Sequence, residues 1–361
     1  MFFLIAIVIM LSILMLGHLA LYYFVVSVFF ISSTTALIIL RTLIVLLPLL
    51  FVGSLVLSSF YNNFFTRTFY KAMAGWLAFF MYLFLSAVVY SIFNFLSLAT
   101  PLFGELLFIF GLIVAIYGII NSNVIRIVKL TVSLPSLPEG WKGRKVVFMS
   151  DLHLGQIRGK AFARRIAKKI NVLSPDIVLI GGDVYDGVRV NTVDIISPLK
   201  EISSQFGTFF IMGNHEEFND NTRYKKALTE AGIRVLLDEV VDVDGLQIVG
   251  VDYHTTEKKE VYEKVLAAIP VDPSRASILL KHVPLHLEVA EAKGISLSLS
   301  GHTHRAQAFP LNIFTHFIYK GYDYGLKRFG SMINYTSCGV GTWGPPIRVG
   351  SQSEIILITL A

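Results

Sequence analysis

Acidic, amide and imidazole side chains repeatedly follow apolar runs in the C-terminal part of this 361-residue chain. Asp151 and His153 come after "KVVFMS", and His302 and His304 come after "SLSLSG". Donors two residues apart share one face of an extended segment, so each pair can approach a common centre. The complete set of seven oxygen and nitrogen donors is Asp151, His153, Asp183, Asn214, His282, His302 and His304.

Seven donors are too many for one metal ion, but they suit two ions that share a bridging carboxylate. Mixed imidazole and carboxylate ligands favour transition metals over Ca or Mg. We therefore expect two divalent ions, with Mn foremost and Fe, Zn or Co as alternatives. Two ions about 3.5–4 Å apart clamp a phosphoryl group and generate a hydroxide nucleophile from water. The donor set predicts a dinuclear metal site for phosphoester hydrolysis.

These donors need strands that end side by side, and six apolar runs are typical of such strands. The runs are "KVVFMS", "DIVLIGG", "TFFIMG", "LQIVGVD", "SILLKH" and "SLSLSGH". Residues 160–172, 193–204, 221–231, 257–268 and 285–293 are typical of helices. Apolar strands with helical connectors predict an α/β sheet covered on both faces. Ligands of such sheets bind beyond the carboxyl ends of the strands, where these donors stand.

The first 125 residues have a different composition, because their only charged side chains are Arg41, Arg67, Lys71 and Glu105. A hydrocarbon core about 30 Å thick needs about 20 apolar residues per helix. Four spans are therefore expected, near residues 3–29, 42–60, 73–97 and 103–122, and short connectors favour an antiparallel bundle. The expected organisation is a transmembrane helical domain over 1–125, a linker over 126–144 and a hydrolytic domain over 145–361.

Basic residues gather on one side of the four expected spans. Arg67 and Lys71 lie in the second connector and further basic residues follow the fourth span, whereas the other side holds only Arg41. The positive-inside rule then places the N-terminus and the hydrolytic domain in the cytoplasm. We expect a multi-pass inner or plasma membrane protein with the lipid bilayer as a partner.

Charge and cysteine content exclude some classes of protein. The net charge is +6, without blocks of like charge or aromatic residues interleaved with basic ones, so we expect no nucleic-acid partner. A basic excess beside a hydrophobic domain is better explained by an anionic membrane face or a phosphate-bearing substrate. The single cysteine, Cys338, excludes an intrachain disulfide.

The ordered motifs "DLH", "GDVYD", "GNHE", "H" and "GHTH" resemble the motif set of calcineurin-like metallophosphoesterases. The end of the chain also resembles membrane-associated bacterial members. This resemblance covers residues from about 145 onward and implies a four-layer α/β/β/α sandwich. It implies one metal on Asp151, His153 and His304, the other on Asn214, His282 and His302, and Asp183 as the bridge. It further implies that His215 is a general acid or leaving-group stabiliser held by Asp186.

Two arginines are candidates for substrate binding. The resembling bacterial proteins often follow His-x-His with two glycines, but Arg305 and Ala306 stand here. Arg305 could bind a phosphate oxygen through two N–H groups, or it could point to solvent or pair with an acid. Arg158 belongs to a basic amphipathic segment, 157–170, that would be drawn to anionic lipid. A solvated helix over a sheet would have the same pattern.

Four spans anchor the hydrolytic domain more firmly than a soluble substrate requires, so a lipid-linked phosphate is the expected substrate. Segment 311–329 is apolar and aromatic, and it is either a flap that dips into lipid or a loop or hairpin of the fold. The chain also resembles metallophosphoesterases that hydrolyse UDP-2,3-diacylglucosamine in lipid A synthesis. A broad-specificity membrane phosphodiesterase is one alternative. A membrane signalling or transport protein with a phosphoesterase-fold regulatory domain is another.

Overall fold

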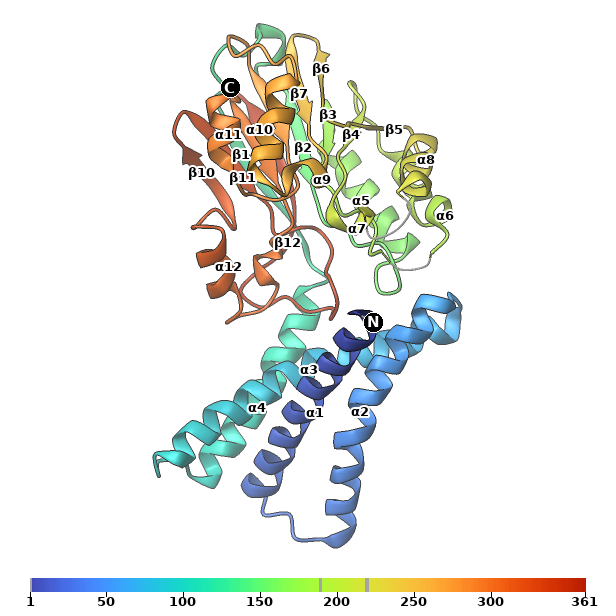
Figure 1. Ribbon diagram of the computed structural model, residues 1–361, viewed down its shortest axis with the longest axis vertical. Helices are drawn as coiled ribbons and strands as arrows, with labels where there is room; N and C mark the ends of the chain where they lie inside the picture. Colours follow the sequence, from blue (N-terminus) through green and yellow to red (C-terminus); the bar gives the residue numbers. More distant parts are fainter. Residues whose placement is uncertain (1, 188–189, 218–220) are drawn as a thin grey trace. The chain divides into compact units, whose positions relative to one another are not determined.

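The computed structural model describes residues 2–187, 190–217 and 221–361 (Figure 1). The chain divides into two compact units. The first consists of Met1–Asn121 with Gly344–Ile347, and the second of Ser122–Trp343 with Arg348–Ala361.

The first unit is built from apolar helices. Its described residues form four of them: α1 (Phe2–Val28), α2 (Thr34–Phe60), α3 (Phe64–Phe95) and α4 (Pro101–Asn121). All four contain a segment long and apolar enough to cross a membrane. Large apolar side chains such as Ile13, Leu46 and Phe110 are exposed on them, as suits helices that face lipid. The expectation of apolar N-terminal helices is confirmed.

Two of these helices begin earlier than the expected spans. The side chain of Ser33 accepts from the backbone N–H of Ala36 at the start of α2. Asn63 and Thr66 form a reciprocal capping box at the start of α3. Capping satisfies N–H groups that have no partner within the helix, so helical hydrogen bonding begins before the sequence becomes purely apolar.

The second unit contains two sheets, each of six strands within the described residues. The order of the first sheet is β1 (Ile125–Val132), β12 (Ser353–Leu360), β2 (Lys145–Met149), β3 (Ile177–Ile180), β4 (Thr208–Phe210) and β5 (Ile233–Val235). The order of the second is β10 (Gly325–Phe329), β11 (Met332–Thr336), β9 (Leu297–Ser300), β8 (Ser277–Leu280), β7 (Leu246–Gly250) and β6 (Glu239–Val243). Strands β2, β3, β4 and β5 run parallel, as do β7, β8, β9 and β11.

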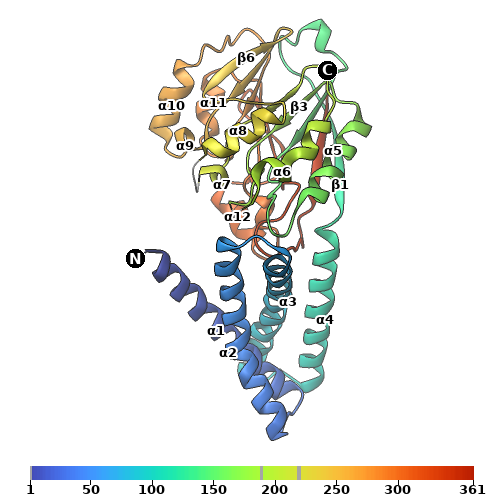
Figure 2. The ribbon, with the colours of Figure 1, turned by 90° about the vertical axis from the view of Figure 1, so that its right-hand side faces the viewer.

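The sheets stack face to face with helices outside them (Figures 1 and 2). Strand β2 explains the layering, because Val146 and Phe148 pack into the core between the sheets while Val147 and Met149 pack beneath helices. The first sheet is covered by α5 (Lys160–Leu173), α6 (Thr192–Ile196), the 3-10 helix η2 (Ser197–Glu201) and α8 (Thr222–Glu230). The second is covered by α10 (Lys259–Ala268) and α11 (Leu287–Ala292). The expected four-layer sandwich is confirmed.

Several elements differ from the sequence expectation. Residues 126–144, expected as a linker, contain most of β1 and the 3-10 helix η1 (Glu139–Trp141). β1 pairs in parallel with β12 along its whole length and belongs to the first sheet. It lies at the edge of the sheet with one strand partner, and Arg126, Lys129 and Thr131 are exposed, so its sequence "IRIVKLTV" mixes polar with apolar residues.

Candidate metal centre

The donors lie in loops at the carboxyl ends of strands from both sheets. Asp151 follows β2, Asp183 follows β3, and Asn214 opens the short helix α7 (Asn214–Glu217) after β4. In the second sheet His282 follows β8, and His302 follows β9 just before the 3-10 helix η3 (His304–Ala306). Parallel strands end at one edge of a sheet, so both sheets deliver their donors to one end of the sandwich.

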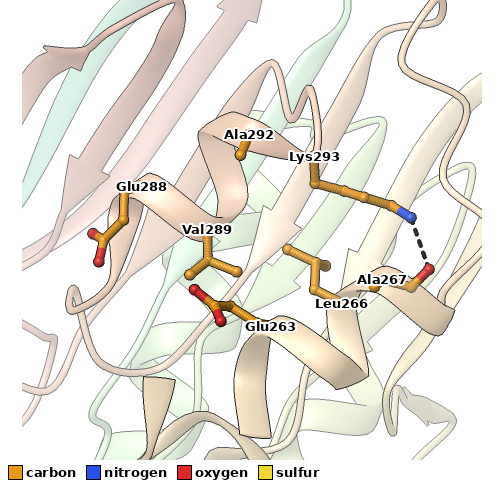
Figure 3. A pocket seen from close by; sticks show the side chains of 7 residues that line it. All are labelled: Glu263, Leu266, Ala267, Glu288, Val289, Ala292 and Lys293. Atoms are coloured by element: carbon orange, nitrogen blue, oxygen red, sulfur yellow. Dashed lines mark hydrogen bonds between the residues drawn. The ribbon is translucent and has the colours of Figure 1, made fainter. Parts of the chain in front are cut away.

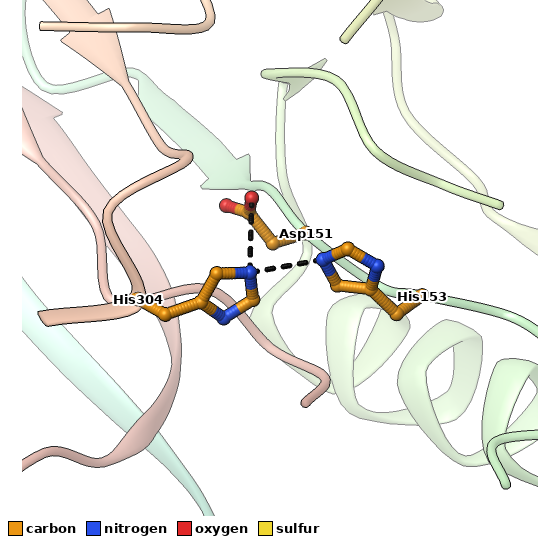
Figure 4. Close-up of side chains that lie close together, drawn as sticks. All are labelled: Asp151, His153 and His304. Carbon is orange, nitrogen blue, oxygen red and sulfur yellow. Dashed lines mark hydrogen bonds and ion pairs between the residues drawn. The ribbon is translucent and has the colours of Figure 1, made fainter. Parts of the chain in front are cut away.

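One group of donors brings together Asp151, His153 and His304 (Figure 4). The Nε2 atoms of His153 and His304 are 2.9 Å apart. Nε2 of His304 lies 3.5 Å from Oδ1 of Asp151. All three side chains are buried, with at most 7% of any residue exposed. Sequence positions more than 150 apart thus meet at one point.

A second group consists of Asp183, His282 and His302. Asn214 joins it, because its Oδ1 lies 3.1 Å from Nε2 of His282 and 2.9 Å from Nδ1 of His302. Nδ1 of His282 lies 2.7 Å from the carbonyl oxygen of Gly181. A carbonyl only accepts, so Nδ1 carries a proton and faces the backbone, and Nε2 is the nitrogen that faces the other donors.

Asp183 lies between the two groups. Its Oδ2 is 3.2 Å from Nε2 of His282 and 3.8 Å from Nε2 of His153. Ligand atoms bound at about 2.0–2.2 Å to one ion stand about 3–3.5 Å from one another, and most of these separations are of that size. Imidazole nitrogens and carboxylate oxygens are typical metal ligands, and here they are buried and face one another. The residues therefore fit two metal ions with Asp183 placed to bridge them.

The electrostatics of the cluster keep several imidazoles neutral. Burial and the neighbouring His282 lower the pKa of His302 to about 3. Burial, followed by His153 and Arg348, also lowers the pKa of His304 well below its usual value. Burial acts against charge on His282, but Asp183 outweighs it and raises that pKa to about 9. Neutral imidazole is the form that binds a metal ion, so His302 and His304 are ready for binding near neutral pH.

The backbone at the donors is strained. Asp151, His153, Asp183, His302 and His304 have φ values between +46° and +67°. A residue other than glycine held in this left-handed region costs about 1–3 kcal/mol, and such residues gather at functional sites. The surrounding sandwich holds these five in place, which points to a function that requires their geometry.

Glycines allow the donor loops to approach one another. A Cβ atom on Gly213 would lie 2.2 Å from Oδ1 of Asp183, and one on Gly301 would lie 2.3 Å from Oδ2 of Asp151. Neither distance is possible for real atoms, so both positions require glycine.

Glu216 is a buried residue of the centre that sequence reasoning missed. Its carboxylate accepts from the backbone N–H groups of Asp183 and Gly213, both at 2.9 Å, and of Tyr185 at 3.0 Å. Burial followed by the charge of Asp183 raises its pKa to about 7. Glu216 ties the loop after β3 to the loop after β4. Its place directly after Asn214 and His215 in "GNHE" was the available signal.

Arg348 is a second residue that sequence reasoning missed. Its guanidinium is fully buried and donates to the carbonyl oxygens of Cys338 at 2.7 Å, Gly341 at 2.6 Å and His304 at 3.2 Å. This clamp joins the loop after β11 to the backbone of a metal-ligand candidate. Nothing in the spacing around Arg348 indicated that role, because its partners are backbone carbonyl groups, which every residue type carries.

His215 lies beside the first donor group, with its ring 4.6 Å from the ring of His153 in an edge-on arrangement. The carboxylate of Asp186 lies 3.2 Å from Nδ1 of His153, so it is placed to orient that ligand. The sequence expectation paired Asp186 with His215 instead. His153, Asp186 and His215 have donor atoms within 4.8 Å of one another, and the role of Asp186 towards His215 stays a prediction.

The two arginines occupy different surroundings. The guanidinium of Arg158 donates to the carbonyl oxygen of Ser122 at 2.8 Å and to Oδ1 of Asn123 at 2.7 Å. Arg305 is partly exposed, and its guanidinium lies over the ring of Tyr324 at 5.0 Å. Arg158 thus has structural partners, and a substrate contact for either arginine stays a prediction.

A surface pocket of about 440 Å³ lies elsewhere, between α10 and α11 (Figure 3). Its lining includes the carboxylates of Glu263 and Glu288, and Lys293 donates to the carbonyl oxygen of Ala267 at 3.1 Å. Two carboxylates repel a phosphate group, so this pocket is not assigned to the substrate.

Comparison with known proteins agrees with this geometry. Residues 144–306 match the family model described as calcineurin-like phosphoesterase. An uncharacterized metallophosphoesterase of Campylobacter jejuni is 33% identical over 270 residues, which cover 73% of this chain and 71% of that protein. An uncharacterized metallophosphoesterase of Aquifex aeolicus is 31% identical, covering 68% of this chain and 95% of that protein.

A transmembrane protein with metallophosphoesterase domain from Danio rerio is 30% identical over 270 residues. The match covers 69% of this chain but only 60% of the zebrafish protein, which is less than two thirds. The names of these relatives state no substrate. Relatives in three distant organisms match most of this chain, and the motif residues lie together in the structure. The chain therefore belongs to the calcineurin-like metallophosphoesterases, a family of phosphoester hydrolases.

Proposed function

We propose that this protein hydrolyses a phosphodiester or diphosphate bond with two divalent metal ions, in a lipid-linked substrate at the membrane surface. One observation carries the hydrolytic part. Oδ2 of Asp183 lies within 4 Å of an imidazole nitrogen of each donor group, at 3.2 Å from His282 and 3.8 Å from His153. A carboxylate in this position holds two cations close together, which is the arrangement that phosphoryl transfer uses.

The residues of the chain have separate tasks in this proposal. Asp151, His153 and His304 would hold one ion, Asn214, His282 and His302 would hold the other, and Asp183 would bridge them. When bound, the metal pair polarises the phosphoryl group and activates water. Asp186 orients His153 through Nδ1, and Glu216 fixes the backbone of Asp183.

His215 is proposed to stabilise the leaving group. Burial lowers its pKa, so the imidazole is neutral near pH 7 and can donate one hydrogen bond through its N–H group. A donor beside the cluster can stabilise the oxygen that departs when the phosphorus–oxygen bond breaks.

The lipid-linked part of the proposal draws on the first unit. Four helices of membrane-spanning length stand before the hydrolytic domain in the chain, and one would suffice as an anchor. UDP-2,3-diacylglucosamine is the specific candidate, because it combines two acyl chains with a diphosphate bond. Manganese is the proposed metal, since imidazole and carboxylate together suit it.

The substrate test uses the purified full chain in lipid nanodiscs. It receives UDP-2,3-diacylglucosamine in the bilayer or a simple aryl phosphodiester in solution, and kcat/KM is measured for each. The proposal expects a clear preference for the diacylated diphosphate. A preference for the aryl ester would contradict the lipid-linked substrate, while the absence of metal-dependent hydrolysis of either compound would contradict the hydrolytic proposal.

We also propose that the hydrolytic domain faces the cytoplasm, from the basic residues Arg67 and Lys71. The sequence expectation placed both in a connector, but they lie in the first turns of α3, at the end of that helix that follows α2. A reporter enzyme that is active only in the cytoplasm, fused after Ala361, is expected to be active. Activity only of a reporter that requires the opposite side would reverse the orientation.

A further inference from the structure

An exposed apolar helix adjoins the metal centre. Helix α12 (Asn312–Ile318) has no buried residue, and Phe317 is 74% exposed while Phe314 and Ile318 are each 63% exposed. We define the α12 face as the exposed apolar residues of this segment: Phe309, Leu311, Ile313, Phe314, Phe317 and Ile318. A contiguous exposed set of large apolar side chains in a soluble domain marks an interaction site.

The α12 face lies at the end of the domain where the chain enters from α4. Phe309 N donates to the carbonyl oxygen of Val349 at 2.8 Å, and the hydroxyl of Ser351 donates to the carbonyl oxygen of Gln307 at 2.8 Å. Two residues further on, the hydroxyl of Ser353 donates to the carbonyl oxygen of Ser122 at 3.3 Å. In both views α12 lies at the end of the α/β domain where β1 begins (Figures 1 and 2).

The connection between α4 and the domain is short and fixed on the domain side. α4 ends at Asn121 and β1 begins at Ile125, so residues 122–124 alone connect them. Three residues span at most about 11 Å. Arg158 holds Ser122 and Asn123 onto the domain through three hydrogen bonds of its guanidinium. The end of the domain that carries the α12 face is therefore the end at which the chain arrives from α4, a helix of membrane-spanning length.

Charge around the α12 face favours a lipid surface over a second protein. Lys320 is exposed two residues after α12, and the partly exposed Lys327 donates to the carbonyl oxygen of Gly321, the next residue. Exposed aromatic and aliphatic side chains flanked by basic residues are typical of segments that lie in the interface of an anionic bilayer. Trp343 is 57% exposed, and its backbone is bonded to the side chain of Gln307, which precedes this face. Tryptophan is enriched at the membrane–water interface, at the level of the lipid headgroups.

The α12 face also connects to the metal centre. Tyr319 ends α12, and its ring lies 6.4 Å from the ring of His302. On the other side, the ring of Trp343 lies 6.3 Å from the ring of His215. The α12 face is therefore connected to the donor cluster by Tyr319, and Trp343 lies beside His215 at the same cluster.

We propose that the α12 face lies in the headgroup and upper acyl region of the bilayer that holds α1 to α4, and that it keeps the metal centre at the level of lipid headgroups. The occupant of this face is the lipid bilayer itself. The proposal concerns docking of the domain and does not depend on which phosphoester is hydrolysed.

The test places a fluorescent label on the face. Cys338 is the single cysteine of the chain and is 1% exposed, so a maleimide dye reacts with an introduced cysteine. Phe317→Cys and Phe314→Cys are labelled with an environment-sensitive dye in the full chain, in nanodiscs that contain phosphatidylglycerol and lipids with a spin label near the headgroup. Val172→Cys on α5, 83% exposed, is the matched control, and the unsubstituted chain measures background labelling.

The expected result is a blue-shifted emission and about a twofold or greater loss of intensity from spin-labelled lipid at 314 and 317, with no loss at 172. Iodide in the buffer should then quench only the label at 172. Quenching by iodide at all three positions would overturn the proposal, because the face would lie in water. Protection at 314 and 317 from both iodide and spin-labelled lipid would also overturn it, because protein would cover the face. An unchanged unfolding temperature of each labelled variant confirms that the fold is retained.

Discussion

The donor cluster and the α12 face lie next to each other but are built in opposite ways. The cluster is buried and held in strained backbone, with Asp151 and His282 fully inaccessible. The α12 face exposes Phe314 and Phe317 and buries no residue of its helix. In the proposed function this difference separates two tasks: the cluster would break the phosphoester bond, and the surface around it would select substrates held in lipid. Substitutions in the cluster should therefore affect every substrate, and substitutions on the face should affect only those embedded in lipid.

A second contrast explains which amphipathic segment remains available to lipid. Segments 157–170 and 311–329 were both candidates for contact with a membrane. In the structure the apolar stripe of α5 packs beneath the first sheet, with Ile166 and Ile170 fully buried. The basic residues of α5 are then the solvated face of an ordinary sheet-covering helix. An apolar stripe in sequence does not reveal whether the fold has already covered it.

The largest effect is expected from Asp183→Asn, because the amide removes the negative charge that is proposed to hold both metal ions. We expect at least about a thousandfold loss of kcat/KM for lipid-embedded and soluble phosphoesters alike, together with loss of bound metal. Metal analysis of the purified chain and hydrolysis of both substrates provide the measurement. Asp194→Asn, at an exposed carboxylate paired with Lys160, is the matched control. Retention of both ions by Asp183→Asn would remove Asp183 from the bridging position.

A smaller loss is expected from Glu216→Gln. The carboxylate of Glu216 accepts hydrogen bonds from backbone N–H groups, and the NH₂ group of glutamine would face one of them. A buried donor would then be unpaired, which lowers the free energy of unfolding by about 1–3 kcal/mol. Metal affinity should fall about 10–100-fold, since Glu216 fixes the backbone of a ligand. Denaturant titration and metal titration measure the two effects. Glu230→Gln, exposed at the end of α8, should change neither, and equal behaviour of the two variants would refute the positioning role.

Arg305→Ala tests whether a partly exposed residue directly after the donor His304 binds substrate. If Arg305 binds a phosphate oxygen, KM should rise about tenfold or more, the effect of losing a charge-assisted hydrogen bond, while metal content stays constant. Arg164→Ala, an exposed arginine of α5, is the control. An unchanged KM would assign Arg305 to its stacking contact with Tyr324 alone.

The smallest effect on the chemistry is expected from Phe314→Ser combined with Phe317→Ser. Hydrolysis of a soluble aryl phosphodiester should change by less than about twofold, because neither side chain touches the donors, whereas hydrolysis of a lipid-embedded substrate should fall about tenfold. Val172→Ser serves as the control. Equal loss for both substrates would mean that α12 supports the cluster structurally, and the contrast between the two regions would fail.

The sequence predicted the central elements well because their signals are local. Strands β2, β3, β4, β7, β8 and β9 are continuous apolar runs, and each of the donors follows one of them. Strands β1 and β10 were missed, because each lies at a sheet edge and includes exposed positions, so neither is a continuous apolar run. Strands β11 and β12 were not among the predicted runs either, although they lie inside the sheets. The early starts of α2 and α3 depend on single capping side chains within polar connectors.

The parts of the site that escaped prediction depend on partners distant in the chain. Arg348 contacts carbonyl groups near residues 304 and 341, and Arg158 contacts Ser122, neither of which a local pattern indicates. The position of the Asp186 carboxylate, 3.2 Å from Nδ1 of His153, was not indicated by the sequence, and the expected role of Asp186 towards His215 stays a prediction. The exposure of α12 could not be predicted from the sequence either, because it depends on which surfaces the two sheets and their helices cover.

The central claim is that a bridged pair of metal ions performs the hydrolysis. The most direct measurement determines the metal content and the phosphodiester hydrolysis of the full chain in nanodiscs, before chelation, after chelation and after a divalent metal is restored. We predict two ions per chain, loss of hydrolysis when they are removed, and recovery when manganese or another transition metal is restored. Full hydrolysis by the metal-free chain would contradict it.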